Sequence, residues 1–201
     1  WSSDVCSSDL EFANKVQLLD DAREVFNIAL LKIGQDPNTQ DPAIIKQAYE
    51  ELLKLRPNVL SFNSDNPANS FISGEVEVGQ LWNGSVRIAK KEKAPLNMVF
   101  PKEGPVLWVD TLAIPATAKN PEGAHKLINY MLGKKTAEKL TLAIGYPTSN
   151  IEAKKALPKE ITEDPAIYPS ADILKNSHWQ DDVGDAIQFY EQYYQELKAA
   201  K

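Results

Sequence analysis

The chain has 201 residues, of which 43% are hydrophobic and 25% charged, enough to bury a core as one globular unit or two small ones. This composition excludes a disordered chain, and no apolar run approaches the roughly 20 residues that a bilayer-spanning helix needs. A formal net charge of −6 argues against nucleic acid as a partner and suits a cationic one.

The first ten residues, WSSDVCSSDL, differ in character from the rest of the chain. They resemble the conceptual translation of a sequencing-adapter oligonucleotide, so we exclude residues 1–10 from the fold. We expect the natural sequence to begin near Glu11, without its signal peptide and N-terminal region. Because Cys6 is the only cysteine, the remaining chain offers no disulfide, thiolate nucleophile or cysteine ligand for a metal.

Strand and helix patterns alternate through the first half of the chain. Asp20 and Asp21 precede apolar positions at helical spacing, and Gly34 can end that helix. Asp41-Pro42 is typical of an N-cap followed by a proline in the first helical turn. Asn83-Gly84 predicts a turn that leaves Trp82 at the end of a strand. We expect strands over residues 16–19, 59–62 and 76–82, and helices over residues 20–33, 41–55 and 71–74.

The stretch from Gly104 to Pro115 is the centre of the predicted fold. Its apolar and β-branched residues predict a buried strand, in which Trp108 and Asp110 share one side because alternate residues face the same way. Strands that alternate with helices predict an α/β layer structure. Around this strand we expect another over residues 96–100, helices over 120–132, 136–144, 151–157 and 172–176, a loop over 158–169 and a last helix from 181.

Two pairs of residues are candidates for ligand binding. Trp108 beside Asp110 suits an organic ammonium ion, because an indole face attracts a cation and a carboxylate accepts its N–H bonds. From these two residues alone we favour the alternative, a core tryptophan followed by an aspartate at a strand end in a turn. Asp21 and Glu24 stand three residues apart at a helix start, and for them we favour a helix cap over a ligand site. Trp82 is either a core residue or an exposed stacking ring.

No motif nominates a catalytic residue, a cofactor or a metal. His125 and His178 lack carboxylates or cysteines at metal-ligand spacing, so we expect no metal site. The sequence has no glycine-rich phosphate loop and no nucleophile elbow, and we therefore expect neither a cofactor nor an enzyme. Tyr146, on a Gly-Tyr-Pro turn, can meet a ligand or merely solvent.

Five blocks of sequence carry a more specific signal. They are LDDAREVF at 19–26, FNSDNPAN at 62–69, LWNGS at 81–85, GYPT at 145–148 and WQDDVG at 179–184. Together they resemble the spermidine/putrescine substrate-binding proteins of polyamine ABC transporters, over most of the chain from about Leu18 to Lys201.

The resemblance implies a two-lobed periplasmic binding protein with the α/β type II, or venus-flytrap, fold. It also implies that the N-terminal part of the first lobe is missing from this chain. Residues 11–108 and 155–201 would form the second, C-terminal lobe, and residues 109–154 would return into the first, N-terminal lobe.

By the same resemblance, seven positions contact a polyamine: Asp21, Glu24, Trp82, Trp108, Asp110, Tyr146 and Gln180. A polyamine is a flexible hydrocarbon that carries ammonium groups at intervals. Its site therefore needs carboxylates spaced along a cleft and aromatic faces that line the methylenes. We expect these side chains to converge in space, with Trp82 close to Glu24.

The implied function is that of an extracytoplasmic receptor, which captures spermidine, and putrescine as well, by lobe closure. It would deliver them to the permease subunits of an ABC transporter. We expect a monomer without nucleic acid, either periplasmic or lipid-anchored outside the membrane in a Gram-positive source. The alternative is a carbohydrate-binding or glycoside-hydrolase-like cleft, since tryptophans and paired carboxylates also bind sugars.

Overall fold

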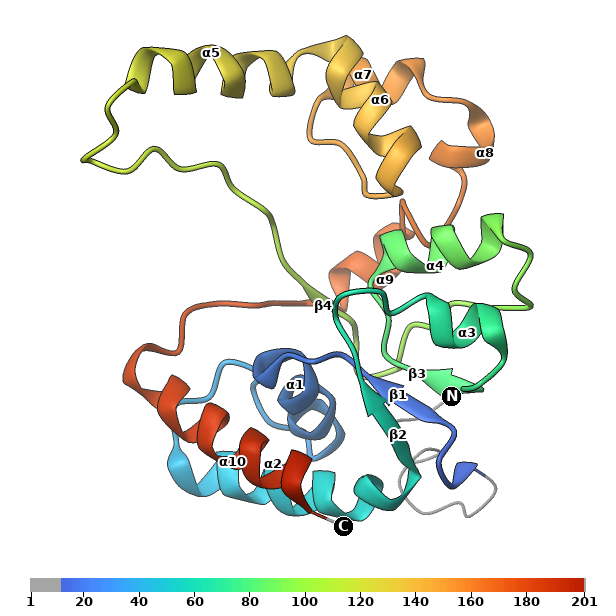
Figure 1. Cartoon of the computed structure of the whole chain (residues 1–201), viewed down its shortest axis with the longest axis vertical. Coiled ribbons are helices and arrows are strands. Elements are labelled where there is room, and N and C mark those ends of the chain that lie inside the picture. The colour runs from blue at the N-terminus through green and yellow to red at the C-terminus, as the bar shows by residue number, and fades with distance from the viewer. Residues whose placement is uncertain (1–11, 201) are drawn as a thin grey trace.

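The computed structural model describes residues 12–200 and contains a small parallel sheet with the strand order β2–β1–β3 (Figure 1). The strands are β1 (Val16–Leu18), β2 (Val59–Phe62) and β3 (Val78–Gly79). Val16 in the central strand lies opposite Val59 on one side and Val78 on the other. The adapter-like residues 1–10 with Cys6, and the expected start near Glu11, lie outside the described residues.

Helices α1, α2 and α10 pack with this sheet to form the main core, and we call these six elements the sheet body. The helices are α1 (Ala22–Lys32), α2 (Pro42–Leu55) and α10 (Ile187–Ala199), with 3-10 turns at Arg56–Asn58 and Gly184–Ala186. Asp21 and Asp41 accept hydrogen bonds from the amides of Glu24 and Ala43, which confirms both predicted helix starts. Parallel strands alternating with packed helices confirm the predicted α/β layers.

Between the sheet body and the helices farther along the chain lie α3 (Asn69–Ser73) and α4 (Asn83–Lys91). The predicted strand over 76–82 is reduced to β3, and the predicted turn at Asn83-Gly84 is wrong because α4 begins there. Gly84 serves close packing instead of a turn: a Cβ at this position would lie 2.5 Å from the ring of Tyr146. Val86 and Ala89, three residues apart, bury one side of the helix.

The predicted central strand is only partly correct. β4 (Val106–Leu107) pairs in parallel with β5 (His178–Trp179), a strand that the sequence reading missed. Beyond Leu107 the chain runs on without a strand partner, and Val109 is 70% exposed, so the expectation of a buried strand to Pro115 is wrong. Residues 96–100 likewise form no strand. A strand persists only where a neighbour accepts its backbone hydrogen bonds.

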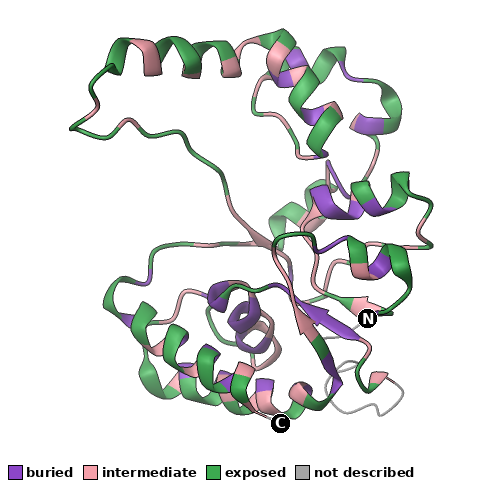
Figure 2. Cartoon of the chain, in the orientation of Figure 1, coloured by how far each residue is buried: buried purple, intermediate pink, exposed green. Residues whose placement is uncertain are grey.

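The remaining helices except α9 lie apart from the sheet body, at the top of Figure 1, whereas α9 lies near the middle of the view. With the exception of α8, they follow the predicted ranges closely. They are α5 (Pro121–Leu132), α6 (Lys134–Ile144), α7 (Ile151–Ala156), α8 (Lys159–Thr162) and α9 (Ala171–Lys175), of which α8 lies within the predicted loop. A small core of Leu157, Ile161 and Ile167 packs with Leu142 of α6. α5 and α6, which we call the helical arm, bury only Ala137 and Thr141 (Figure 2).

Candidate functional site

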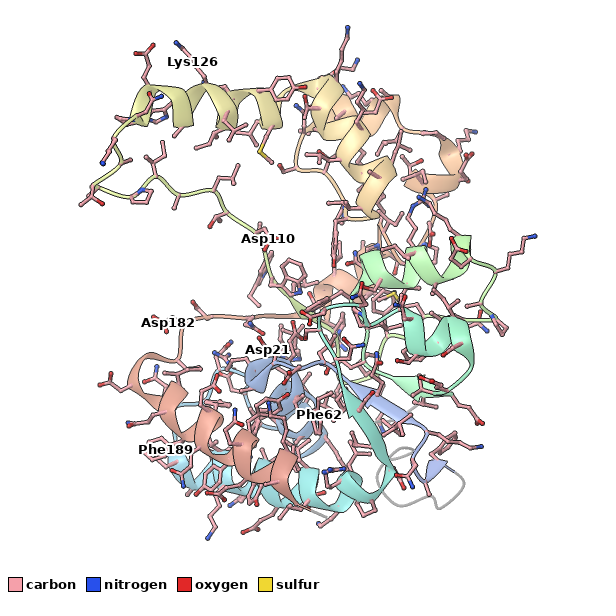
Figure 3. The ribbon with its side chains drawn as sticks, in the orientation of Figure 1. Asp21, Phe62, Asp110, Lys126, Asp182 and Phe189 are labelled. Carbon is pink, nitrogen blue, oxygen red and sulfur yellow. The ribbon has the colours of Figure 1, made fainter. Side chains whose placement is uncertain are left out.

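A cavity of about 490 Å³ collects residues from segments far apart in the sequence. It is lined by Glu24, Trp82, Trp108, Val109, Asp110, Tyr146 and Gln180. Six of the seven residues predicted to contact a ligand are in this lining, and only Asp21 is not. Figure 3 shows Asp21 at the head of α1 and Asp110 on the extended segment that leaves β4.

Glu24 is held in the cavity wall by two neighbours. Its Oε1 accepts a hydrogen bond from the indole Nε1 of Trp82 at 3.1 Å, which confirms the expected proximity of these two residues. Gln80 donates its Nε2 to the backbone oxygen of Glu24 at 2.8 Å and to its Oε2 at 3.5 Å. Burial raises the pKa of Glu24; the Trp82 hydrogen bond partly opposes this effect, and the charge of Asp21 adds to it.

Asp21 does not line the cavity, but it caps the helix that carries Glu24. Its Oδ1 accepts the backbone N–H of Glu24 at 3.0 Å, so the preferred reading as a helix cap is confirmed. The capping box is not closed reciprocally, because the carboxylate of Glu24 turns toward Trp82 and Gln80. Asp21 therefore fixes the first turn of α1, on which Glu24 stands.

Trp108 and Tyr146 join Trp82 in the aromatic part of the wall. Their ring centroids lie 5.7 Å apart at an interplanar angle of 62°, an edge-to-face contact. Tyr146 follows Gly145, whose φ of +80° requires the left-handed conformation that glycine adopts readily. Burial raises the pKa of the Tyr146 hydroxyl, and the negative charges of Asp110 and then Glu24 add to that shift. The cavity is thus a place of negative potential beside aromatic rings.

Gln180 reaches the cavity from the end of β5. Its backbone N–H donates to the oxygen of Leu107 at 2.8 Å, and its side-chain Oε1 accepts from Asn27 Nδ2 at 3.0 Å. Asn38 fixes the residues on either side: it donates to the oxygen of Trp179 at 2.7 Å and accepts from the amide of Asp181 at 2.8 Å. The backbone at Gln180 is therefore held from both sides.

The sequence reading missed the residues that position this site. Gln80 stands two residues before Trp82, and the alternation of an extended chain could have placed both on one side. Asn27 stands three residues after Glu24, so helical spacing could have placed it on the same face of α1. The long-range pairing of Asn27 with Gln180, 153 residues away, gave no local signal.

The arrangement places carboxylates beside aromatic rings, which are groups of the kind that attract an organic cation. His178 points its Nε2 at the backbone oxygen of Glu103, at 2.9 Å. Within residues 12–200, no three histidine, cysteine, aspartate or glutamate side chains gather as a metal site would require. None of the helices described is both long and apolar enough to cross a membrane.

The sequence pattern of one protein family, the bacterial extracellular solute-binding proteins, matches residues 7–169. The chain belongs to this family. This solute-binding protein is 53% identical over 191 residues to the spermidine/putrescine-binding periplasmic protein of Salmonella typhimurium, covering 95% of the chain and 55% of the relative. It is 36% identical over 166 residues to the putrescine-binding periplasmic protein PotF of Escherichia coli, with 79% and 45% covered. It spans about half the length of these curated relatives.

Solved structures give the same result for the fold. A chain assigned to a spermidine/putrescine ABC transporter of Listeria monocytogenes superposes with a TM-score of 0.93 at 33% identity, over 100% of this chain and 62% of that one. The substrate-binding protein of the spermidine/putrescine ABC transporter of Streptococcus pneumoniae gives 0.78 at 28% identity, over 99% and 62%. The predicted family and its α/β binding-protein fold are confirmed.

Proposed function

We propose that this solute-binding protein contributes a polyamine site to an extracytoplasmic receptor, which passes spermidine, and putrescine as well, to the permease subunits of an ABC transporter. The observation that carries the proposal is the convergence of Glu24 and Asp110 with the rings of Trp82, Trp108 and Tyr146 around one cavity. The names of the relatives support the same ligand class.

The physical argument rests on charge. Glu24 is a half-buried carboxylate, and its burial raises its pKa because the charged form is costly away from water. An ammonium group would offset that cost, with a hydrogen bond to a charged group contributing about 1.5–3 kcal/mol before desolvation. A cation over a desolvated ring contributes up to about 2 kcal/mol. Methylenes between the ammonium groups would lie along the aromatic faces.

We extend the proposal to the remaining expectations. Residues 11–108 and 155–201 act as one lobe, and residues 109–154 belong to the other, so that closure of the lobes excludes water from the ammonium groups. The receptor works as a monomer on the outer side of the cytoplasmic membrane, without nucleic acid, and it carries out no reaction.

A carbohydrate ligand is the weaker alternative. Sugars are neutral and would leave the charge of Glu24 without a counterion, and the relatives are named for polyamines. We therefore do not favour the sugar-binding cleft.

The test is a titration of the 201-residue chain with spermidine, putrescine and a neutral disaccharide, followed by the indole N–H signals of the tryptophans in NMR spectra. Spermidine should shift the signals of Trp82 and Trp108, whereas the disaccharide should not. Asp110→Asn should weaken spermidine binding on the order of tenfold, since a hydrogen bond to a charged group contributes about 1.5–3 kcal/mol and the exposure of Asp110 puts the loss at the lower end of that range. Equal titration curves for wild type and Asp110→Asn would contradict the proposal, as would a response to the disaccharide alone.

A further inference from the structure

Gln180 supplies a carboxamide to a cavity whose other polar side-chain groups are carboxylates, a phenol and indole N–H groups. The two ends of a carboxamide have nearly the same shape but opposite hydrogen-bonding character, since the oxygen accepts and the NH₂ group donates. An ammonium ligand carries only donors. It is therefore attracted by the oxygen of Gln180 and repelled by its nitrogen.

In the structure, a hydrogen bond from Asn27 engages the end of Gln180 that a cation would need. Asn27, which is 2% exposed, donates its Nδ2 to Gln180 Oε1 at 3.0 Å. Within residues 12–200 the Nε2 of Gln180 makes no hydrogen bond to the protein, so this donor end is the one left for the cavity or for water.

The same arrangement leaves a buried oxygen unsatisfied. Asn27 Oδ1 is buried and has no hydrogen-bond partner among the described residues. If both carboxamides flip, so that the oxygen and nitrogen of each exchange positions, Asn27 Oδ1 accepts a hydrogen bond from Gln180 Nε2. Gln180 Oε1 is then free for a ligand. Each arrangement leaves one polar atom of Asn27 unpaired, so neither is strongly preferred by the protein itself.

The surroundings allow the side chains to turn without moving the strand. The backbone of Gln180 is bonded to Leu107, and the flanking residues are held by Asn38. Any change between the two arrangements is therefore confined to the two terminal amide groups, which is a small rearrangement with two discrete states.

We infer that Asn27 is a specificity-determining residue that acts through Gln180. Its Oδ1 accepts a hydrogen bond from the NH₂ group of Gln180, and this orients the Gln180 oxygen toward a cationic ligand. This inference rests on the proposed polyamine binding. Asn27 is a positioning residue and does not itself touch the ligand, because it is buried behind Gln180.

The first test is the exchange of side-chain amide protons with water in the ¹⁵N-labelled 201-residue chain. Saturating spermidine should slow exchange of the Gln180 NH₂ protons about tenfold or more, because one of them becomes bonded to buried Asn27. The exposed amide of Asn129, on α5, is the control and should not change. If the Trp82 indole signal shifts while exchange at Gln180 is unchanged, the inference is wrong and the proposed function stands.

The second test is a double-mutant cycle on spermidine affinity, measured by the same NMR titration. Asn27→Leu and Gln180→Met should each weaken binding on the order of tenfold, and the double variant by about the same tenfold, because the two residues act as one unit. Asn129→Leu, the matched control, should bind as wild type. A double variant weakened about a hundredfold would show that Asn27 acts independently of Gln180 and would overturn the inference.

The two tests cover the case in which Asn27→Leu does not fold, since proton exchange needs only the wild-type chain. If spermidine leaves the Trp82 indole signal of wild type unmoved, the proposed function fails, and this inference fails with it.

Discussion

The sheet body and the helical arm are built from similar amphipathic helices, but only the sheet body buries their apolar sides. In α1 the side chains of Phe26 and Leu30 are fully buried, whereas Leu127 of α5 is 58% exposed and Ile144 of α6 is 47% exposed. Both regions have the spacing that predicts a helix. The difference shows that an apolar stripe at helical spacing predicts a helix with an apolar face, but does not predict which surface, if any, buries that face.

The exposed stripe of the arm continues into a larger hollow beside the candidate site. That hollow, of about 1270 Å³, shares Glu24, Trp82 and Trp108 with the smaller cavity and extends over Met131 and Ile144. Contiguous apolar surface of this kind marks an interaction site or an aggregation-prone face. The site therefore lies where the packed and the unpacked regions meet.

The largest expected effect comes from matched truncations in the two regions. Phe26→Ala should lower the free energy of unfolding by about 3–5 kcal/mol, because it leaves a cavity against Tyr190 in the core of the sheet body. Leu127→Ala on the arm should change it by less than about 0.5 kcal/mol. Urea unfolding of both variants measures the difference, and a similar loss in both would mean that the arm is packed as tightly as the core.

Limited proteolysis tests the same difference between the two regions by showing where the first cuts fall. A nonspecific protease should cut first within residues 109–154, at least about a hundredfold faster than within α1 or α2. Few apolar contacts protect that segment against local unfolding, which exposes the backbone to cleavage. Mass spectrometry of the first fragments identifies the site of cleavage. First cuts within the sheet body would contradict the comparison.

Smaller effects are expected from the pH dependence of stability in the sheet body. Asp20 accepts hydrogen bonds from Tyr194 at 2.6 Å and Lys198 at 3.0 Å, and these, the Tyr194 bond above all, lower its pKa. Its contribution to stability is present above its unfolded pKa and is lost as pH falls through the lowered value. Because Asp20 is largely exposed, Asp20→Asn should cost less than about 1 kcal/mol near neutral pH.

Glu24 should show the opposite sign. Its folded pKa is raised, so its contribution to stability is full below the unfolded value and is lost as pH rises through the folded one. Glu24→Gln should therefore stabilise the ligand-free chain near neutral pH while it weakens spermidine binding. Unfolding curves of Asp20→Asn and Glu24→Gln across the acidic pH range would show whether the two carboxylates change the free energy of unfolding in opposite directions as the pH rises. Destabilisation by Glu24→Gln at neutral pH would mean that its charge is already compensated.

Features set by a few neighbouring residues could be predicted from the sequence. Asp21, Asp41 and Asn120 cap helices by reaching amides two or three residues ahead, so spacing alone located these helix starts. The resemblance added six residues that the structure gathers at one cavity, although they come from distant segments.

Features that depend on a distant partner could not be predicted. The strand after Gly104 stops at Leu107 because β5 offers it only two residues for pairing. The Asn83-Gly84 pattern predicts a turn, whereas the lack of a side chain at Gly84 allows α4 to approach Tyr146. The contact of Asn27 with Gln180 has no counterpart in local spacing.

The most direct test of the proposed polyamine site is the pKa of the Glu24 carboxyl group, measured by ¹³C NMR with and without saturating spermidine. Burial raises this pKa, and a bound ammonium group should lower it toward its ordinary value, with release of protons on binding. Gln80→Met, which removes a donor to Glu24, is a useful comparison because it alters the wall without adding charge. A pKa of Glu24 that stays raised in saturating spermidine would contradict the account.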